Sequence, residues 1–441
     1  MPNKIEEIAP IQNARRTLPA TPAQGRAVWA WAFYDFANSP FATTITAVIF
    51  NVYFAKVVAK NAPLYGDTIW GILVAISTLL AGILCPFLGA LADLRGTKKP
   101  WLAFSAAIGS LATMSLFWSG PGTLLMSSVL FIVANLSFSL SLGFYNAFLN
   151  DLATDKTIGR VSGLGWALGY VGGGLCLAIN LAMIQKPEIF GLPTANDIPV
   201  RMSCLICGLW WGIFTVPLIL WVPEKKTSSV PADASWKAAW ELVVRSIKSA
   251  RTYNRNLFRC LIAYLLYNDG IETVVIMAGL FASQALGMTQ GQIIACFLMI
   301  QFVAFFGAII FGKLGDAWGN KKALQLSLTL WAAVLFWALF MKTQTEFWIA
   351  GAFIAIVLGG SQSLSRSLFG KLVPKGSEAQ FYGFQNLSSK ISATLGPLAY
   401  GVSREITGSP RIAILSMLIF FIAGQALLAG VQESAPRQAD E

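Results

Sequence analysis

The chain has 441 residues, of which 56% are hydrophobic and only 12% charged, with a mean hydropathy of +0.62. Soluble domains carry about a quarter charged residues, so this composition excludes an ordinary soluble protein and indicates lipid as the solvent. A net charge of +11 would also suit a nucleic-acid-binding protein, but its distribution along the chain, described below, excludes that class.

Hydrophobic stretches long enough to cross a bilayer recur along the whole chain. A helix of about 20 residues crosses the hydrocarbon core. Some stretches contain a proline, as at Pro40, Pro86, Pro217 and Pro397, which a membrane helix tolerates when neighbouring groups satisfy the freed backbone. The sequence predicts twelve transmembrane spans, at 29–55, 69–92, 101–118, 123–149, 161–184, 204–222, 258–283, 292–312, 324–341, 347–369, 381–403 and 411–431.

Lys and Arg are distributed unevenly between the loops on the two sides of the membrane. With the N-terminus in the cytoplasm, and with basic residues near a span end counted with the adjoining loop, the cytoplasmic segments carry 24 of the 32 basic residues, the opposite loops carry 7, and Lys390 lies deep inside a span. This positive-inside bias predicts that both termini are cytoplasmic. The excess of Lys and Arg is therefore explained by the orientation of the chain in the membrane, and no nucleic-acid partner is expected.

Hydrophilic segments flank and divide the spans. Residues 1–28 and 432–441 are predicted cytoplasmic tails, and 223–257 is a predicted cytoplasmic linker. Within the linker, Trp236 and Trp240 fall on one helical face with Val243, Val244 and Ile247. This pattern predicts an amphipathic helix, which either lies on the cytoplasmic leaflet or is a solvated part of the linker.

One loop motif occurs twice, in corresponding places. The pattern G-x-L-x-D-x-x-G-x-K-K follows the second span and again the eighth, 223 residues later. This repeat predicts internal duplication, with six-helix halves at 29–222 and 258–431. Each motif Asp can accept hydrogen bonds from a neighbouring helix N-terminus and so latch the cytoplasmic side, or it can simply cap a helix. The motif residues are Gly89, Asp93, Gly96, Lys98 and Lys99 in the first copy and Gly312, Asp316, Gly319, Lys321 and Lys322 in the second.

This organisation resembles the major facilitator superfamily, whose signature lies between its second and third helices. The resemblance implies an all-α membrane protein with twelve transmembrane helices in two pseudo-symmetric six-helix bundles, and a cytoplasmic gating role for the two loop motifs. Leu94 and Ala317 stand where the usual motif has Arg, and Thr97 and Asn320 replace a second basic residue. These departures weaken the transfer of the motif's charge pairing.

Further motifs point to one branch of that superfamily. The segments 31–44 (WAFYDFANSPFATT), 159–174 (GRVSGLGWALGYVGGG), 267–270 (YNDG) and 361–367 (SQSLSRS) carry this likeness. Over residues 28–431 the chain resembles the family of the fungal vacuolar amino-acid effluxer linked to autophagy and its bacterial relatives. The resemblance implies amino acids as the substrate. The compact loops favour a bacterial inner membrane over a vacuole.

Few ionisable residues lie deep inside the spans, and each is a functional candidate because a charge at membrane depth is costly. Asp35 and Asn38 share a face of the first span, and Asp269 and Glu272 share a face of the seventh. In the superfamily these two helices line the central cavity, which implies contact with substrate there. Because the chain contains no His, a carboxylate would have to carry any coupled proton.

Other features are given simpler interpretations. Lys390 could bind a substrate carboxylate, neutralise an acid, or merely fix helix packing. Gly165, Gly169 and Gly173 form a small-residue stripe that predicts close helix packing. All six Cys fall inside predicted spans, so neither a disulfide nor a metal site is expected.

The sequence therefore predicts a secondary active transporter, not an enzyme, for a small-molecule substrate, driven by protons if a carboxylate carries them. No phosphate-cradling loop is present, and no cofactor is expected. The protein is expected to contact the lipid bilayer. We expect it to be a monomer. The alternatives left open are a membrane-embedded enzyme, a lipid scramblase, or a receptor on the same fold that no longer transports.

Overall fold

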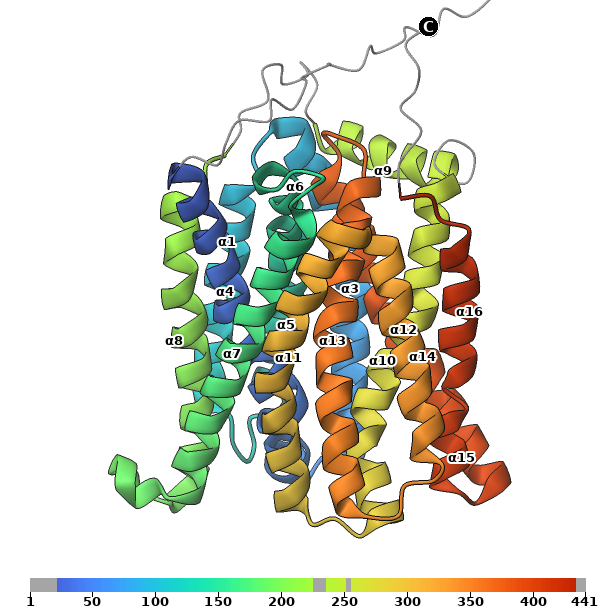
Figure 1. Ribbon diagram of the computed structural model, residues 1–441. Coiled ribbons are helices and arrows are strands. Elements are labelled where there is room, and N and C mark those ends of the chain that lie inside the picture. The colour runs from blue at the N-terminus through green and yellow to red at the C-terminus, as the bar shows by residue number, and fades with distance from the viewer. Residues whose placement is uncertain (1–21, 225–234, 251–254, 434–441) are drawn as a thin grey trace, which may run out of the picture.

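The structure is a computed structural model that describes residues 22–224, 235–250 and 255–433. Most of both predicted tails therefore lies outside the described chain. Every regular element in the described ranges is a helix, and the long helices run side by side in one bundle (Figure 1). Ten of them are long and apolar enough to cross a membrane, within the part of the chain that was described.

The first half contributes six spanning segments, as predicted. The first changes from an α-helix to a π-helix at Pro40, where the wider turns follow the proline. Its elements are α1 (Pro22–Pro40), the π-helix η1 (Phe41–Val48), α2 (Phe50–Tyr53) and a second π-helix (Phe54–Val58); then follow α3 (Gly66–Arg95), α4 (Lys99–Ser115), α5 (Leu124–Ala147) with the short α6 (Leu149–Leu152), α7 (Ile158–Gln185) and α8 (Ile198–Trp221).

The second half repeats this order. Its elements are α10 (Arg255–Leu286), α11 (Gln290–Trp318), α12 (Asn320–Ala338), α13 (Gln344–Leu372), α14 (Glu378–Thr407), and the last span formed by α15 (Pro410–Leu415) and α16 (Leu418–Ala429). Helices α12 and α14 are not among the ten, because α12 starts with two lysines and α14 carries many polar residues. Both run alongside their neighbours in Figure 1, and they complete twelve membrane helices.

The helix between the halves, α9 (Trp236–Ala250), lies across one end of the bundle (Figure 1); this end is called the α9 end below. Ala239 and Val243 are buried against Ala90 and Leu91 of α3. Trp236 keeps 53% of its surface exposed. The amphipathic helix predicted in the linker is therefore present, and its apolar face packs on the bundle itself.

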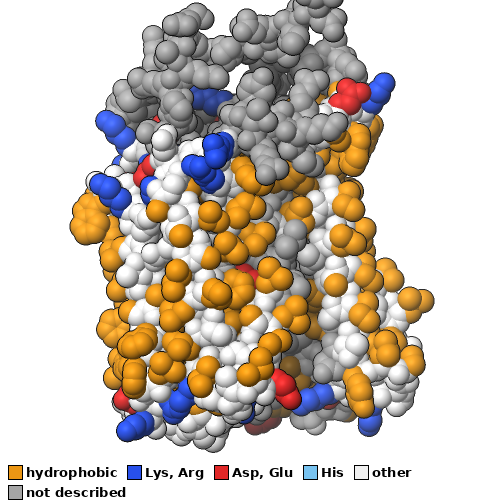
Figure 2. Space-filling model, turned by 90° about the vertical axis from the view of Figure 1, so that its right-hand side faces the viewer, with side chains coloured by type: hydrophobic (Ala, Val, Ile, Leu, Met, Phe, Trp, Pro, Cys, Tyr) orange, Lys and Arg blue, Asp and Glu red, His pale blue; other side chains and the backbone are white. Residues whose placement is uncertain are grey.

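The outer surface matches a lipid environment. Figure 2 shows hydrophobic side chains over the middle of one face, with Lys and Arg gathered toward the two ends. Large apolar side chains such as Phe306, Ile310 and Leu398 are more than half exposed. A soluble protein rarely exposes apolar surface on this scale, so the hydrophobic band is where lipid contacts the helices.

Candidate functional site

The buried centre of the molecule holds an ion pair that joins the two halves. Asp35 on α1 and Arg366 on α13 are 2.9 Å apart between Oδ2 and Nη1, and the side chains are only 8% and 5% exposed. Tyr145 on α5 donates its hydroxyl to the same Asp35 oxygen at 2.8 Å. Because removing two charges from water is costly, such a pair persists only with good geometry and additional hydrogen bonds.

Arg366 obtains those additional contacts from the first half. Its Nε donates to Ser162 Oγ at 2.9 Å, and its Nη2 donates to the Ser162 carbonyl at 2.6 Å. The guanidinium also lies over the rings of Trp31, Tyr145 and Trp166, at 5.1 to 5.5 Å from their centroids. A planar guanidinium can donate in fixed directions and stack on aromatic rings at the same time, which an ammonium cannot do.

Arg366 is the residue that the sequence pattern does not reveal. It lies three residues before the end of the predicted span 347–369, where a basic residue normally marks topology. Its place in the segment 361–367, which carries the family resemblance, was the signal that could have singled it out. It is one of the 24 basic residues counted on the cytoplasmic side, but its side chain is buried.

The three glycines predicted to form a packing stripe on α7 face α1. A Cβ on Gly165 would stand 2.7 Å from Arg366 Nη2 and 2.8 Å from Asp35 Oδ2, closer than real Cβ contacts. The absence of a side chain therefore makes room for the ion pair itself. The stripe meets α1 at three successive levels: Gly165 against Asp35, Gly169 against Ser39, and Gly173 against Thr43.

Asp269 is held by a different partner from Asp35. It is fully buried on α10, and its Oδ1 accepts a hydrogen bond from the backbone N–H of Gly396 on α14 at 3.0 Å. Among the described contacts, nothing links Asp269 to Arg366 or to Asp35. The two acids that share equivalent helices in the repeat therefore occupy separate environments.

The remaining predicted residues differ in their placement. Asn38 is buried on α1, and its Nδ2 has no hydrogen-bond partner among the described residues. Glu272 is partly buried, and its charge acts on Tyr170 of α7, as does the charge of Asp35. Lys390 lies on α14, but its side chain falls outside the described residues. The charge of Glu272 therefore acts on the first half, whereas Asp269 bonds to α14.

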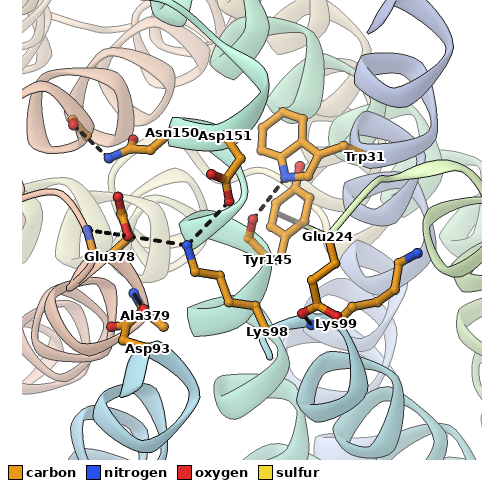
Figure 3. Close-up of polar contacts among 12 residues, drawn as sticks. Trp31, Asp93, Lys98, Lys99, Tyr145, Asn150, Asp151, Glu224, Glu378 and Ala379 are labelled. Atoms are coloured by element: carbon orange, nitrogen blue, oxygen red, sulfur yellow. Dashed lines mark hydrogen bonds and ion pairs between the residues drawn. The ribbon is translucent and has the colours of Figure 1, made fainter. Parts of the chain in front are cut away.

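At the α9 end, the first loop motif contacts the second half. Asp93 accepts hydrogen bonds from the backbone N–H groups of Ala379 at 3.2 Å and Gln380 at 2.9 Å. These are the first-turn donors of α14, which have no partner within their own helix. Figure 3 shows Asp93 directed at this helix start. A carboxylate placed there is also favoured by the helix dipole.

The second motif makes the equivalent contact in the other direction. Asp316 on α11 accepts hydrogen bonds from the backbone N–H groups of Gly159 at 2.8 Å and Arg160 at 3.1 Å, at the start of α7. Each half therefore caps a helix of the other half through the same motif position. This reciprocal pair of contacts is the structural counterpart of the sequence repeat.

The motif glycines allow these contacts to form. A Cβ on Gly89 would lie 2.5 Å from the Ala379 carbonyl oxygen, and a Cβ on Gly312 would lie 2.7 Å from the Gly159 carbonyl oxygen. The first glycine of each motif thus lets two backbones touch across the halves. The second, Gly96, adopts φ 63° where α3 ends, a left-handed conformation that glycine tolerates best.

Lys98 adds ion pairs across the same interface. Its Nζ is 3.3 Å from both Asp151 Oδ2 in the first half and Glu378 Oε2 in the second, as Figure 3 shows. Burial opposes the charged form of Lys98, but the charges of Asp151, Glu378 and Asp93 raise its pKa above the usual value. Lys98 is therefore a cation at neutral pH and links both halves.

A carboxylate after the last helix of each half caps the third helix of that half. Glu224 accepts a hydrogen bond from the Lys99 backbone N–H at 2.7 Å. Glu433 accepts from the Asn320 and Lys321 backbone N–H groups at 2.8 and 3.1 Å, and it pairs with Lys371 at 2.8 Å. Burial acts to raise the pKa of Glu433, but these hydrogen bonds outweigh it and lower the pKa.

Several of the described contacts between the halves lie at one end of the bundle. Those of Asp93, Asp316 and Lys98 lie at the α9 end, and the Asn150 side chain also donates to the Gly370 carbonyl there at 3.0 Å. The Asp35–Arg366 pair lies further inside. The conformation described here is therefore closed at the α9 end.

An apolar pocket lies within the second half. It has a volume of about 90 Å³ and lies between α10, α11, α12 and α13, and its lining includes Val274, Phe297 and Leu358. Gln301 is the polar member of the lining, and its side chain approaches Gly173 of α7. None of the acids discussed above lines this pocket, so it is separate from the ion pair.

The chain matches a sequence model of the family described as "Vacuole effluxer Atg22 like" over residues 67–440. It is 32% identical to the uncharacterized MFS-type transporter YxiO of Bacillus subtilis, over 92% of this chain and 94% of that protein. It is 22% identical to autophagy-related protein 22 of Eremothecium gossypii, over 93% of this chain and 91% of that protein.

Solved structures agree on the fold. The human organic anion transporter MFSD10 superposes with a TM-score of 0.72 at 13% identity, covering 92% of this chain and all of that chain. The transporter FucP in its outward conformation superposes with a TM-score of 0.70 at 12% identity, covering 93% of this chain and all of that chain. FucP is described as a major facilitator superfamily transporter. The chain therefore belongs to the Atg22-like family of the major facilitator superfamily.

Proposed function

We propose that this protein is a secondary active transporter that exports a small solute, with amino acids as the first candidates, by alternating access. The observation that carries the proposal is the buried Asp35–Arg366 pair, because it ties the two halves together at the centre of the bundle. Membership of a transporter family supports it, and autophagy-related protein 22 relatives, described as vacuole effluxers, favour export.

Proton coupling follows from the chemistry of that pair. Protonation of Asp35 would remove the negative charge that holds Arg366, leaving a buried cation without its partner. The cross-half contact would then weaken, and Arg366 would become free to bind an anionic group such as a solute carboxylate. We therefore assign Asp35 as the proton carrier and Arg366 as the residue that responds to it.

The reciprocal aspartate contacts provide the gate. Asp93 and Asp316 hold the α9 end closed by capping helices of the opposite half, and opening requires both contacts to break. We place this end in the cytoplasm of a bacterial cell, with the protein in the inner membrane and both termini on the cytoplasmic side. The uneven distribution of Lys and Arg supports that orientation.

The other predicted residues are given supporting roles. Asn38 is one turn from Asp35 on α1 and has an unused donor, which suits contact with a solute. Glu272 acts electrostatically on Tyr170, between the halves. Lys390 remains a candidate for the solute carboxylate.

Transport in proteoliposomes tests the coupling. An imposed pH gradient should drive amino-acid movement by the wild type, and Asp35→Asn should abolish the gradient-driven component. The exposed Asp197→Asn serves as the matched control and should transport normally. Full gradient-driven transport by both Asp35→Asn and Asp269→Asn would contradict proton coupling through these carboxylates.

A further inference from the structure

The hydrogen bonds of the Arg366 side chain all go to the first half in the described chain. Its Nη1 donates to Asp35 Oδ2 at 2.9 Å and to Asn146 Oδ1 at 3.4 Å, and its Nε and Nη2 donate to the hydroxyl and carbonyl oxygens of Ser162. Arg366 itself belongs to α13 of the second half. The first half therefore supplies a carboxylate and three further acceptors, and the second half supplies the cation.

Aromatic rings of the first half surround the same guanidinium. Its central carbon lies 5.1 Å from the ring centroid of Trp31, 5.5 Å from that of Tyr145 and 5.4 Å from that of Trp166. Rings in this position attract a cation through their negative faces. We call this group of first-half residues the cage: Trp31, Asp35, Tyr145, Ser162 and Trp166.

The cage is held together by contacts within the first half. Trp31 stacks on Tyr145 at 4.5 Å and donates its indole N–H to the Tyr145 carbonyl at 2.9 Å. The Tyr145 hydroxyl donates to Asp35 at 2.8 Å. Gly165 of α7 leaves the space for the guanidinium, because a Cβ there would stand 2.7 Å from Arg366 Nη2. None of these features comes from α13, so we expect the cage to keep its form when α13 moves away.

Separation of the halves would leave the cage without its cation. Arg366 would move with α13, and the Asp35 carboxylate would remain among aromatic rings with no counter-charge, which is costly. A guanidinium group fits this place best, because it is planar, donates in fixed directions and stacks on rings at the same time. A quaternary ammonium could stack but has no N–H to donate.

We infer that the cage is a binding site for a solute that carries a guanidinium group. Arg366 occupies the site in the conformation described here, and the solute takes its place when the halves part. The inference rests on the proposed alternating access, and it adds the chemical class of the ligand.

A proton and the solute would compete for Asp35. The carboxylate has one negative charge, which either a proton or a guanidinium can neutralise. Arrival of a proton would therefore favour release of the solute, which is what proton-driven export requires.

Removal of the Arg366 side chain should leave the cage open to a small cation. In purified full-length Arg366→Ala protein in detergent, millimolar methylguanidinium chloride should raise the melting temperature relative to equal NaCl, because a ligand of the folded state stabilises it. The wild type should not respond over the same range, since Arg366 fills the cage.

Three further variants test where the cation binds. Arg160→Ala is the matched control, because it removes an exposed arginine that pairs with Asp316, and it should not respond. Asp35→Asn added to Arg366→Ala should abolish the response. Trp166→Leu in the same background should weaken the affinity about 2- to 30-fold, the range of one cation–π contact. The Trp166 indole N–H has no partner among the described residues, so this change breaks no hydrogen bond.

The wild type offers a test that needs no Arg366 variant. Methylguanidinium can enter the cage only after Arg366 has left, so at higher concentration it should favour the conformation with the halves apart. Spin labels at the exposed positions 156 and 375 should then show a larger population at long distance than in equal NaCl. In Asp35→Asn protein the ligand should cause no such change.

Three results would overturn the inference. The first is that methylguanidinium changes neither the melting temperature of Arg366→Ala protein nor the distances in the wild type. The second is an equal response of Arg366→Ala to tetramethylammonium, which has no N–H. The third is an equal response to urea, which is planar but uncharged.

These measurements involve no transport. Methylguanidinium binding without any solute transport would refute only the proposed function, whereas amino-acid exchange without methylguanidinium binding would refute only this inference.

Discussion

At the residue scale, the central feature is a charge pair that neither half could bury alone. Asp35 comes from α1, and Arg366 comes from α13, with Tyr145 and Ser162 completing the hydrogen bonds. Removing one partner of a buried pair strands the other, whereas replacing both partners avoids that cost. The pair should therefore link stability to the proposed transport function at one point.

Breaking the pair on one side should destabilise the closed conformation strongly. We expect Arg366→Gln to lower the free energy of unfolding by about 3–5 kcal/mol, and the double variant Asp35→Asn/Arg366→Gln to recover part of that loss. Thermal unfolding in detergent would measure both. Arg160→Gln, which removes an exposed cation 3.5 Å from Asp316, should cost at most about 1 kcal/mol. Equal losses in all three variants would argue against a special role for the central pair.

Substitution of Gly165, which lies beside the pair, should also destabilise the protein. Gly165→Ala places a Cβ within 2.8 Å of three polar atoms of the cluster, so we expect a loss of about 1–3 kcal/mol from overpacking. Gly143→Ala on α5 has nothing within 4 Å of its new Cβ and should be neutral or slightly stabilising. The same thermal measurement checks both, and an unaffected Gly165→Ala protein would contradict the packing described here.

At the element scale, the two loop motifs act as reciprocal caps. Asp93 caps α14, and Asp316 caps α7. The sequence repeat predicted that both motifs lie at one end of the bundle and that their aspartates could cap helices. It could not tell which helices are capped, because that depends on how the two halves pack. The ion pairs of Lys98 and Glu433 likewise join chain segments that are far apart in sequence.

Neutralising one cap should loosen the α9 end. Asp93→Asn weakens the contact with the α14 start by roughly 0.5–2 kcal/mol, since it removes the charge that the helix dipole favours. Spin labels at the exposed positions 156 and 375 would report the distance between the halves, because all native cysteines in the chain are buried. The variant should show a larger population at long distance. An unchanged distribution would mean that other contacts hold this end closed.

The ion pairs at this end should not respond to physiological changes in pH. The pKa of Glu433 is lowered, so its contribution to stability is present above its usual pKa and is lost only as pH falls through the lowered value. The pKa of Lys98 is raised, so its contribution is present below its usual pKa of about 10.4 and is lost as pH rises through the raised value.

Between about pH 5 and pH 9, the Lys98 and Glu433 ion pairs should therefore keep their charges. A change in the spin-label distances over this range would have to come from groups outside these two pairs.

At the scale of the whole molecule, the twelve-helix, two-half architecture could be predicted from hydropathy and from the repeat, because lipid forces backbone polar groups into helices. Solved major facilitator structures with TM-scores near 0.7 confirm it. The candidate site was only partly predictable. Asp35 and Asp269 stand out as acids inside apolar spans, but the pairing of Asp35 with Arg366 joins residues 331 positions apart, and only packing determines it.

The separation of the two acids also has a physical reason. Asp269 lies opposite a glycine on α14 and accepts its backbone N–H. The equivalent position on α1 instead meets the aromatic and glycine-lined pocket that accepts Arg366. The two halves therefore share one architecture, but the two acids have different partners.

Counterflow in proteoliposomes tests most directly whether this protein transports amino acids by alternating access. Vesicles are loaded with one unlabelled amino acid at a time and diluted into a trace of the same labelled compound. We predict transient accumulation of label for at least one amino acid with wild-type protein, and its loss in Arg366→Gln protein that is still folded. If no amino acid exchanges label above protein-free vesicles, the proposed function is contradicted.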